Sequence, residues 1–153
     1  IAGEVDSLLT EIKDKHSKCA VAYADCGTYG ALDTVIATHG VKRLGGNHCY
    51  DIFAGSKKIE EIMESDAGTY FLTDFLVKSF HRSVMVELGL DKRPELRDDY
   101  FKNYSRVIWL AQQPSKELEE LAAQAAASIG LPLEIQNVGY GQLAQQVKEL
   151  LSN

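Results

Sequence analysis

Two short stretches of the sequence hold the residues best suited to chemistry. Cys26 lies in DCGTYG, and Cys49 directly follows His48 in GNHCYD. Thiolates and imidazoles are the ligands that Zn²⁺ takes in tetrahedral protein sites, and thiolates also bind softer metals and iron-sulfur clusters. We therefore predict that Cys26, His48 and Cys49 are metal ligands, with zinc or another thiophilic metal as the ion and an iron-sulfur cluster as an alternative.

The same residues allow two other interpretations. At the N-terminus of a helix, the dipole lowers the pKa of a thiol, which would make Cys26 and Cys49 redox or nucleophilic groups. As structural residues, both cysteines would be small apolar fillers and His48 would cap a helix. The spacing matches no standard zinc signature, so all three interpretations stay open at this point.

Polar or glycine-rich residues follow every strand that the sequence predicts. Carboxylates can move protons between a site and its substrate, and Asp25 and Asp74 are our candidates for that catalytic role. Asp25 and Asp51 are also candidates for orienting the imidazole from behind the ligands. The cofactor-binding candidates are Gly27, Tyr29, Gly30, Tyr140 and Gly141. Neither of their loops has the GxGxxG or GxxxxGK[ST] spacing of nucleotide-binding loops.

Helical and strand-like patterns alternate along the chain. Apolar or β-branched runs predict strands over residues 19–24, 41–44, 69–73, 106–111 and 133–138. Helical spacing of apolar residues predicts helices over 5–15, 31–39, 50–65, 75–89, 115–130 and 142–151. Such alternation specifies an α/β fold, a doubly wound, Rossmann-like parallel sheet of about five strands with helices on both faces. The loops that follow parallel strands meet at one edge of the sheet, so the candidate residues are expected to gather there.

Length and composition limit the class of protein. The 153 residues, 45% of them hydrophobic, predict a single α/β domain over 1–153. The formal charge of −6, without a block of Lys or Arg, excludes the electrostatic pattern of nucleic-acid and membrane-surface binding. No apolar run reaches the roughly 20 residues that span a bilayer. A small-molecule ligand is the expected partner, with a second copy of the chain or another protein as an alternative. Three cysteines, an odd number, favour a reducing cytoplasm.

Five stretches together resemble a known family. VAYADCGTYGALD, GGNHCYDIFAG, AGTYFLTDFLV, LDKRPELRDDYFKNYSRVIWLAQ and GYGQL are similar to the family called domain of unknown function 1638, from about residue 19 to residue 143. The resemblance implies no established activity. It also implies an upstream strand ending in a Cys-Gly-Ala loop, which this sequence lacks, so we expect the chain to be truncated at its N-terminus by a strand and a helix. Some relatives are associated with corrinoid-dependent methyl transfer, which makes a corrinoid an alternative cofactor.

The function predicted from these observations is that of a metal-binding α/β protein. Its Cys/His site would lie at the C-terminal edge of the sheet, and the protein would be a metal-dependent enzyme of small-molecule metabolism. One alternative is a non-catalytic accessory protein of one-carbon metabolism that carries a metal, a corrinoid or an iron-sulfur cluster. The other is a thiol redox protein. The sequence leaves open whether the chain is an enzyme.

Overall fold

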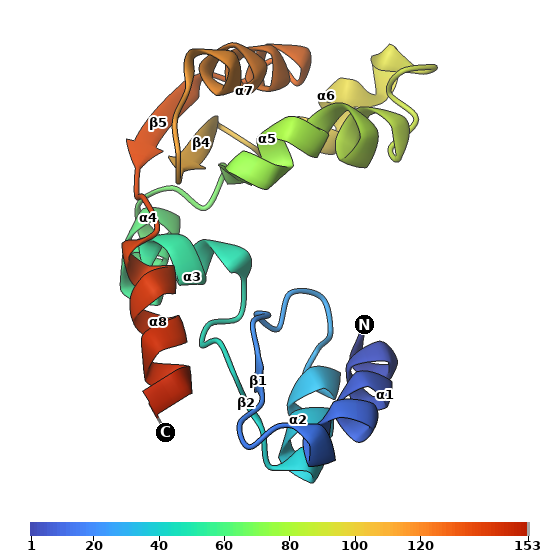
Figure 1. Cartoon of the computed structure of the whole chain (residues 1–153). Coiled ribbons are helices and arrows are strands. Elements are labelled where there is room, and N and C mark those ends of the chain that lie inside the picture. The colour runs from blue at the N-terminus through green and yellow to red at the C-terminus, as the bar shows by residue number, and fades with distance from the viewer. Residues whose placement is uncertain (153) are drawn as a thin grey trace. The chain divides into compact units, whose positions relative to one another are not determined.

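The computed structural model describes residues 1–152, and its contacts divide the chain into two compact units (Figure 1). Unit 1 combines Ile1–Ser56 with the C-terminal segment that begins at Gly141, and unit 2 is Lys57–Tyr140. Helices flank parallel strands in both units, which confirms the α/β class. One domain over 1–153 stays a prediction, and its last residue, Asn153, lies outside the described residues.

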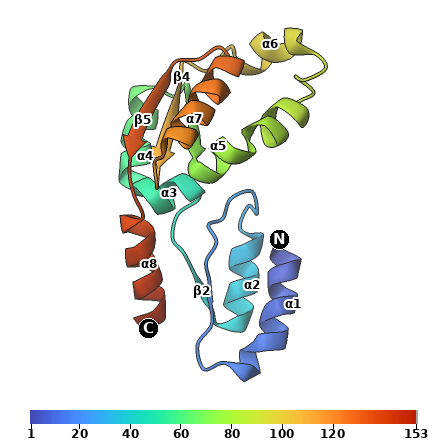
Figure 2. The same cartoon turned by 45° about the horizontal axis from the view of Figure 1, so that its top comes forward.

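Unit 1 is built on two short parallel strands. Its elements are α1 (Ala2–Ile12), β1 (Ala20–Val21), α2 (Ala31–His39), β2 (Lys42–Arg43), α3 (Cys49–Ala54) and α8 (Gly141–Ser152). Helices α1 and α2 contact one face of the strands through a core of Leu9, Leu32 and Ile36. Helix α8 contributes apolar side chains to a second core, around Leu44 and Ile52. In Figure 2, α8 lies on the other side of β2 from α1 and α2.

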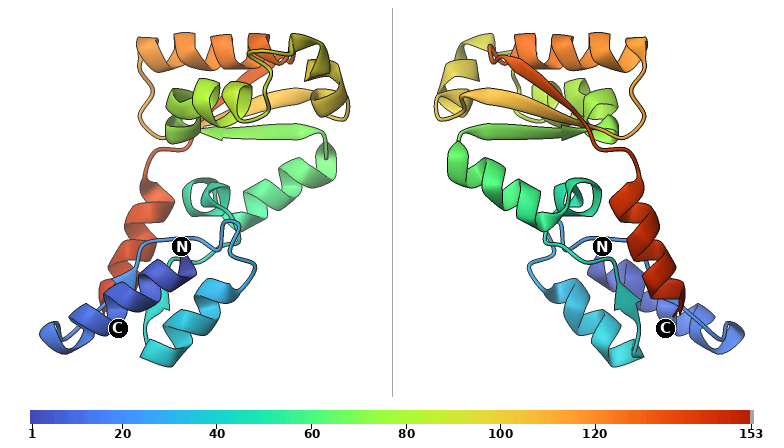
Figure 3. Two further views of the ribbon diagram at one scale, coloured as in Figure 1. Left: turned by 90° about the vertical axis from the view of Figure 1, so that its right-hand side faces the viewer. Right: turned by 90° about the vertical axis from the view of Figure 1, so that its left-hand side faces the viewer.

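Unit 2 is a three-layered arrangement around a parallel sheet. Its elements are α4 (Ser56–Ser65), β3 (Thr69–Thr73), α5 (Asp74–Phe80), α6 (Arg97–Phe101), β4 (Arg106–Ala111), α7 (Lys116–Ser128) and β5 (Leu133–Asn137). The strand order is β3-β4-β5. Helices α5 and α7 lie on one side of the sheet and α4 on the other (Figure 3). Both connections run in the same direction along the sheet, and right-handed crossovers place such helices on one face.

The core of unit 2 follows from the register of its strands. Leu72 is paired with Trp109, and Tyr70 with Val107. Alternate residues of a strand point to the same face, so these pairs contact α5 and α7. Trp109 is completely buried. This burial explains why the apolar run 106–111 predicts its strand correctly.

The five predicted strands do not form one sheet. They form a two-stranded sheet, β1-β2, and a three-stranded sheet, β3-β4-β5. The first strand is also shorter than the predicted 19–24 and is not buried on both faces, because Ala20 and Ala22 are exposed. The two residues of β1, Ala20 and Val21, and the charged pair in β2 offer little apolar surface to extend the pairing.

The predicted helix over 50–65 is two helices. Gly55 has a φ of 85° and separates α3 from α4, because a left-handed residue cannot continue a right-handed helix. Helix α5 follows Thr73 as its N-cap, whose hydroxyl oxygen accepts a hydrogen bond from Leu76 N at 3.3 Å.

Within the described part of the chain, we find no helix with the length and hydropathy needed to cross a bilayer.

Candidate functional site

The loops after β1 and β2 leave the small sheet at the same end. Ala20 is paired with Lys42 and Val21 with Arg43, in parallel, and Leu44 N donates a hydrogen bond to Val21 O at 3.1 Å. Cys26 lies in the first loop, and Cys49 begins helix α3 after the second. The parallel register therefore delivers both cysteines to one region of unit 1.

The Cys26 thiol affects the ionisation of Cys49. Burial raises the pKa of the Cys49 thiol to about 11, and the neighbouring Cys26 thiol adds to this increase. Backbone N–H groups at the start of α3 lower the pKa of Cys49, but they do not outweigh burial. Both cysteines are free and partly buried. The start of the helix therefore acts on the pKa of Cys49 in the expected direction, but burial decides the outcome, and Cys49 is protonated at neutral pH.

His48 directly precedes Cys49 and is the N-cap residue of α3. It is exposed, and its ring centroid is 5.9 Å from that of Tyr50. Among the residues that the structure describes, no group of three or more His, Cys, Asp or Glu side chains is placed to hold a metal ion. Metal binding by Cys26, His48 and Cys49 together thus stays a prediction.

Asp51 fixes the loop that carries His48 and Cys49. Its Oδ2 atom accepts hydrogen bonds from Asn47 N at 2.8 Å and from His48 N at 3.0 Å. The backbone, rather than the imidazole, is thus its partner in these bonds. Gly46 lies against this carboxylate with a φ of 94°, and a Cβ atom there would be 2.6 Å from Asp51 Cβ. The loop therefore requires glycine at position 46.

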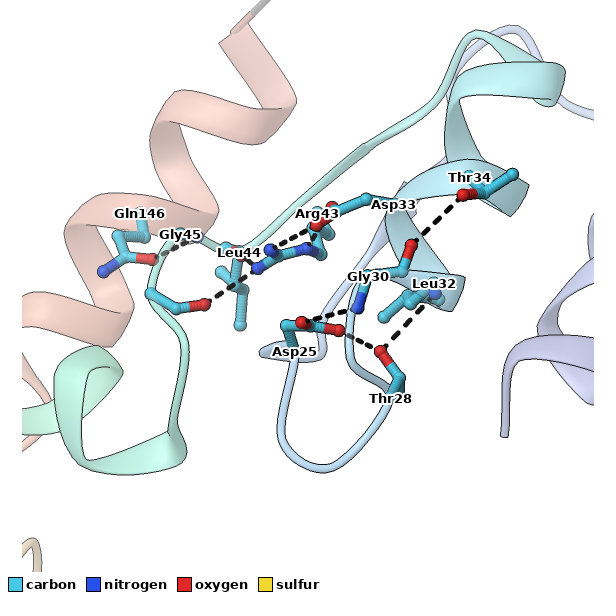
Figure 4. A network of polar contacts seen from close by, with 11 residues as sticks. Asp25, Thr28, Gly30, Leu32, Asp33, Thr34, Arg43, Leu44, Gly45 and Gln146 are labelled. Carbon is cyan, nitrogen blue, oxygen red and sulfur yellow. Dashed lines mark hydrogen bonds and ion pairs between the residues drawn. The ribbon is translucent and has the colours of Figure 1, made fainter.

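Asp25 performs a similar task in the first loop (Figure 4). One carboxylate oxygen accepts a hydrogen bond from the Thr28 hydroxyl, and the other accepts one from Gly30 N at 3.0 Å. Thr28 Oγ1 in turn accepts from Leu32 N at 3.4 Å in the first turn of α2. These bonds join the loop after β1 to the start of α2. Asp25 thus has a structural role, and its catalytic role stays a prediction.

The predicted cofactor-binding residues of this loop have an unusual backbone. Gly27 and Gly30 have φ angles of 75° and 82°, and Tyr29 between them has a φ of 50°. The left-handed region is unfavourable for a bulky residue, and such strain is often found at functional loops. The Tyr29 side chain is 96% exposed. It is therefore presented to solvent rather than used in the core.

Arg43 is a site residue that the sequence analysis missed. Its guanidinium group binds both Asp33 carboxylate oxygens, at 2.6 and 3.0 Å, and donates to the carbonyl oxygens of Leu44 and Gly46 at 2.8 and 2.9 Å (Figure 4). Arg43 lowers the pKa of Asp33 through this hydrogen bonding. Asp25 adds a further attraction for the guanidinium. In the sequence, the signal that could have identified Arg43 was an arginine inside a short strand, shortly before a pair of glycines.

Asp74 belongs to unit 2, where it joins the ends of β3 and β4. Its carboxylate accepts hydrogen bonds from Trp109 Nε1 at 2.9 Å, Gln112 N at 3.1 Å and Gln113 N at 2.8 Å. Asp74 N donates to Gln112 Oε1 at 2.9 Å. The carboxylate is buried, and both its oxygens have partners. This arrangement stabilises the sheet edge, and proton transfer by Asp74 stays a prediction.

The remaining cofactor-binding candidates lie where the chain passes from one unit to the other. Tyr140 is the last residue of unit 2 and is 48% exposed. Gly141 is the first residue of α8 in unit 1. Binding of a cofactor by either residue stays a prediction.

Comparisons with known proteins place the chain in a family. Searches of curated proteins and of solved structures give no match. The model of one family, described as protein of unknown function (DUF1638), matches residues 1–147. This match covers both loops that carry the cysteines and confirms the resemblance noted in the sequence. The chain therefore belongs to the DUF1638 family of proteins of unknown function.

Proposed function

We propose that Cys26 and Cys49 form a dithiol site that is reversibly oxidised to a disulfide. The observation that carries the proposal is that the parallel strands β1 and β2 bring the two loops to one end of the sheet, where the Cys26 thiol affects the ionisation of Cys49. The surrounding loops are held by Asp25, Asp51 and Arg43 through hydrogen bonds to backbone and side-chain partners. Loops fixed in this way favour an intramolecular disulfide over mixed products.

The oxidant in the proposed reaction is a disulfide, either of a small thiol or of a partner protein. The Cys26 thiolate attacks one sulfur of that disulfide, forms a mixed disulfide and displaces the first thiolate, which takes up a proton. Cys49 then loses its proton and attacks Cys26 Sγ, so the second thiol of the oxidant leaves. In total, two thiols lose two protons and two electrons, and the oxidant becomes two thiols.

The environment of Cys49 sets this order of attack. The pKa of about 11 leaves very little Cys49 thiolate at neutral pH, so the first attack falls to Cys26. Once Cys26 is in the mixed disulfide, it no longer carries a charge that repels the Cys49 thiolate. Attack by Cys49 on the mixed disulfide is thereby easier than a first attack on the oxidant by Cys49 would have been.

Redox buffers of reduced and oxidised glutathione test the proposal. We expect a disulfide that peptide mapping assigns to Cys26 and Cys49, with a defined reduction potential. Cys19→Ser is the matched control, because Cys19 contacts the apolar core of unit 1. This variant should behave like the original chain, whereas Cys26→Ser and Cys49→Ser should lose the intramolecular disulfide. Stable glutathione adducts in the original chain, without a bond between Cys26 and Cys49, would refute the proposal.

A second candidate function is binding of a thiophilic metal ion by the same two sulfur atoms. Two thiols from separate loops are a ligand pair for zinc or a softer ion, and a cation would favour the thiolate form of Cys49 that burial disfavours. The described residues supply no third or fourth ligand group, so other ligands would come from a substrate, a partner or further chain. An iron-sulfur cluster, a corrinoid and a metal-dependent activity remain proposals of the same kind.

Metal analysis separates the second candidate from the first. Protein purified without chelator should contain near-stoichiometric metal that is lost in both Cys26→Ser and Cys49→Ser and retained in Cys19→Ser. Metal content equal in all four proteins would contradict a metal site at these thiols.

A further inference from the structure

A cavity of about 260 Å³ lies in unit 2, between α5 and α7. One of its walls is α5 with the segment that continues it, and the other is the C-terminal part of α7. All its lining residues belong to unit 2, whereas Cys26 and Cys49 belong to unit 1. The cavity is therefore separate from the dithiol site.

The first wall has an unusual backbone. Helix α5 continues without a break into a π-helical segment, His81–Val86, which contributes His81 and Met85 to the cavity. A π-helical turn is rare and is frequently found at a functional site. The cavity thus coincides with a backbone feature that often accompanies binding.

The inner part of the cavity is apolar. Val77, Phe80 and Ala125 are buried and also belong to the core of unit 2. Leu121 and Met85 are partly buried and pack against the same core. Such a surface favours the hydrocarbon part of a ligand, and a methionine side chain adapts to its shape.

The exposed part of the lining is polar. It contains Lys78, His81 and Gln124. Lys78 and His81 are three positions apart on one helical segment, so they lie on the same face. Among the described residues, none forms an ion pair or a hydrogen bond with the side chain of Lys78, His81 or Gln124. All three side chains are therefore available to donate hydrogen bonds to a ligand.

Carboxylates of the protein do not take this place. None of the described residues that line the cavity is Asp or Glu. Asp74, one turn before Lys78, is buried and accepts hydrogen bonds at the ends of β3 and β4. Glu120, one turn before Gln124, is exposed and is not within ion-pair distance of Lys78 or His81. A negatively charged ligand would thus meet donors rather than carboxylates.

We infer that this cavity binds a small carboxylate with a hydrocarbon tail. The tail lies against the apolar inner part, and the carboxylate accepts hydrogen bonds from Lys78, His81 and Gln124. One ammonium group beside an imidazole and a neutral amide suits a single negative charge, and charged hydrogen bonds are the stronger ones. At roughly 30 Å³ for a water-sized group, the cavity holds about nine such groups, close to the size of octanoate.

Calorimetric titration of the whole chain with octanoate tests this inference. The comparison ligands are 1-octanol and octylamine, which carry the same tail with a neutral or a positive head group. We expect octanoate to bind at least tenfold more tightly than either, because only its head group accepts charged hydrogen bonds. Octanoate should also shift the amide NMR signals of α5 and α7 but not those of α4.

Variants separate the head group from the tail. Lys78→Gln should weaken octanoate binding about tenfold through loss of a charged hydrogen bond, and Lys78→Arg should retain it. Ala125→Leu fills the apolar part of the cavity and should abolish binding. Lys58→Gln is the matched control, since Lys58 is an exposed lysine on α4, and it should leave binding unchanged. Urea unfolding of each variant distinguishes a loss of binding from a loss of fold, and the exposed Lys78 should be replaceable without a change in midpoint.

Three results would overturn the inference. The first is no detectable binding of octanoate. The second is binding of 1-octanol or octylamine that is as tight as that of octanoate. The third is octanoate binding that both Lys78→Gln and Ala125→Leu leave unchanged.

Discussion

Oxidation of the dithiol site should make unit 1 more resistant to opening. A disulfide between positions 26 and 49 closes a loop of about 23 residues (49 − 26) in the unfolded chain. The chain-entropy relation then gives a stabilisation of about 3 kcal/mol, which is the upper value expected because strain in the folded state reduces it. At neutral pH Cys49 is protonated in the reduced protein, so its ionisation adds no free energy that would offset this stabilisation.

Amide hydrogen exchange measures this effect in the part of the chain concerned. Helix α2 lies between the two cysteines, whereas β4 belongs to unit 2 and serves as an internal comparison. We expect exchange in α2 to slow by up to about one hundred-fold on oxidation, the factor that about 3 kcal/mol corresponds to. Exchange in β4 should change much less, and Cys26→Ser should show no effect of the oxidant.

The result that would refute this reasoning is a Cys26–Cys49 disulfide that leaves exchange in α2 unchanged or makes it faster. Such a disulfide would have to pull the loops out of their reduced positions, and the strain would then cancel the entropic gain. The two thiols would not be neighbours in the reduced protein.

Four further predictions concern single residues. Burial raises the pKa of Cys49 to about 11, so its alkylation by iodoacetamide should increase until about pH 11. For the same reason, the free energy of unfolding should fall as pH rises above the unfolded thiol pKa of about 8.5. Gly46→Ala should destabilise the protein by about 2 kcal/mol in urea unfolding, whereas Gly3→Ala, which meets no neighbouring atom, should not. Arg43→Met should cost about 2 kcal/mol by the same measurement, through loss of two carbonyl partners. Asp74→Ala leaves three donors unpaired and should cost about 3 kcal/mol, seen by tryptophan fluorescence; an unchanged midpoint would contradict its structural role.

The sequence predicts most helices and strands because their patterns are strong and bounded. Residues 31–39, 69–73 and 106–111 coincide with α2, β3 and β4. Each ends at glycine, at a polar capping residue or at a turn, and both strands are rich in β-branched and aromatic residues. The break at Gly55 was visible as a glycine in the middle of a helical pattern, but a single glycine is often tolerated in a helix.

The arrangement of the strands was harder to predict. Alternation of elements indicates parallel pairing, and both sheets are parallel. It contains no information on whether β2 and β3 join one sheet. That outcome depends on the apolar area which each strand can bury, and β2 consists of Lys42 and Arg43.

The sequence indicates where the candidate loops lie but not the electrostatics there. Parallel strands implied that the loops carrying Cys26 and Cys49 would leave the sheet at one end, and β1 and β2 are parallel. The direction of the Cys49 pKa shift depends on burial, which no local pattern specifies. Arg43 and Asp33 come from a strand and a helix, so their pairing appears only in three dimensions.

The most direct test of the dithiol site is its reaction with phenylarsine oxide, a trivalent arsenical that bridges two neighbouring thiols. Intact mass should show one arsenical per reduced chain, lost in both Cys26→Ser and Cys49→Ser and kept in Cys19→Ser. Absence of the adduct from the original chain, or its survival in Cys26→Ser, would show that Cys26 and Cys49 do not lie together.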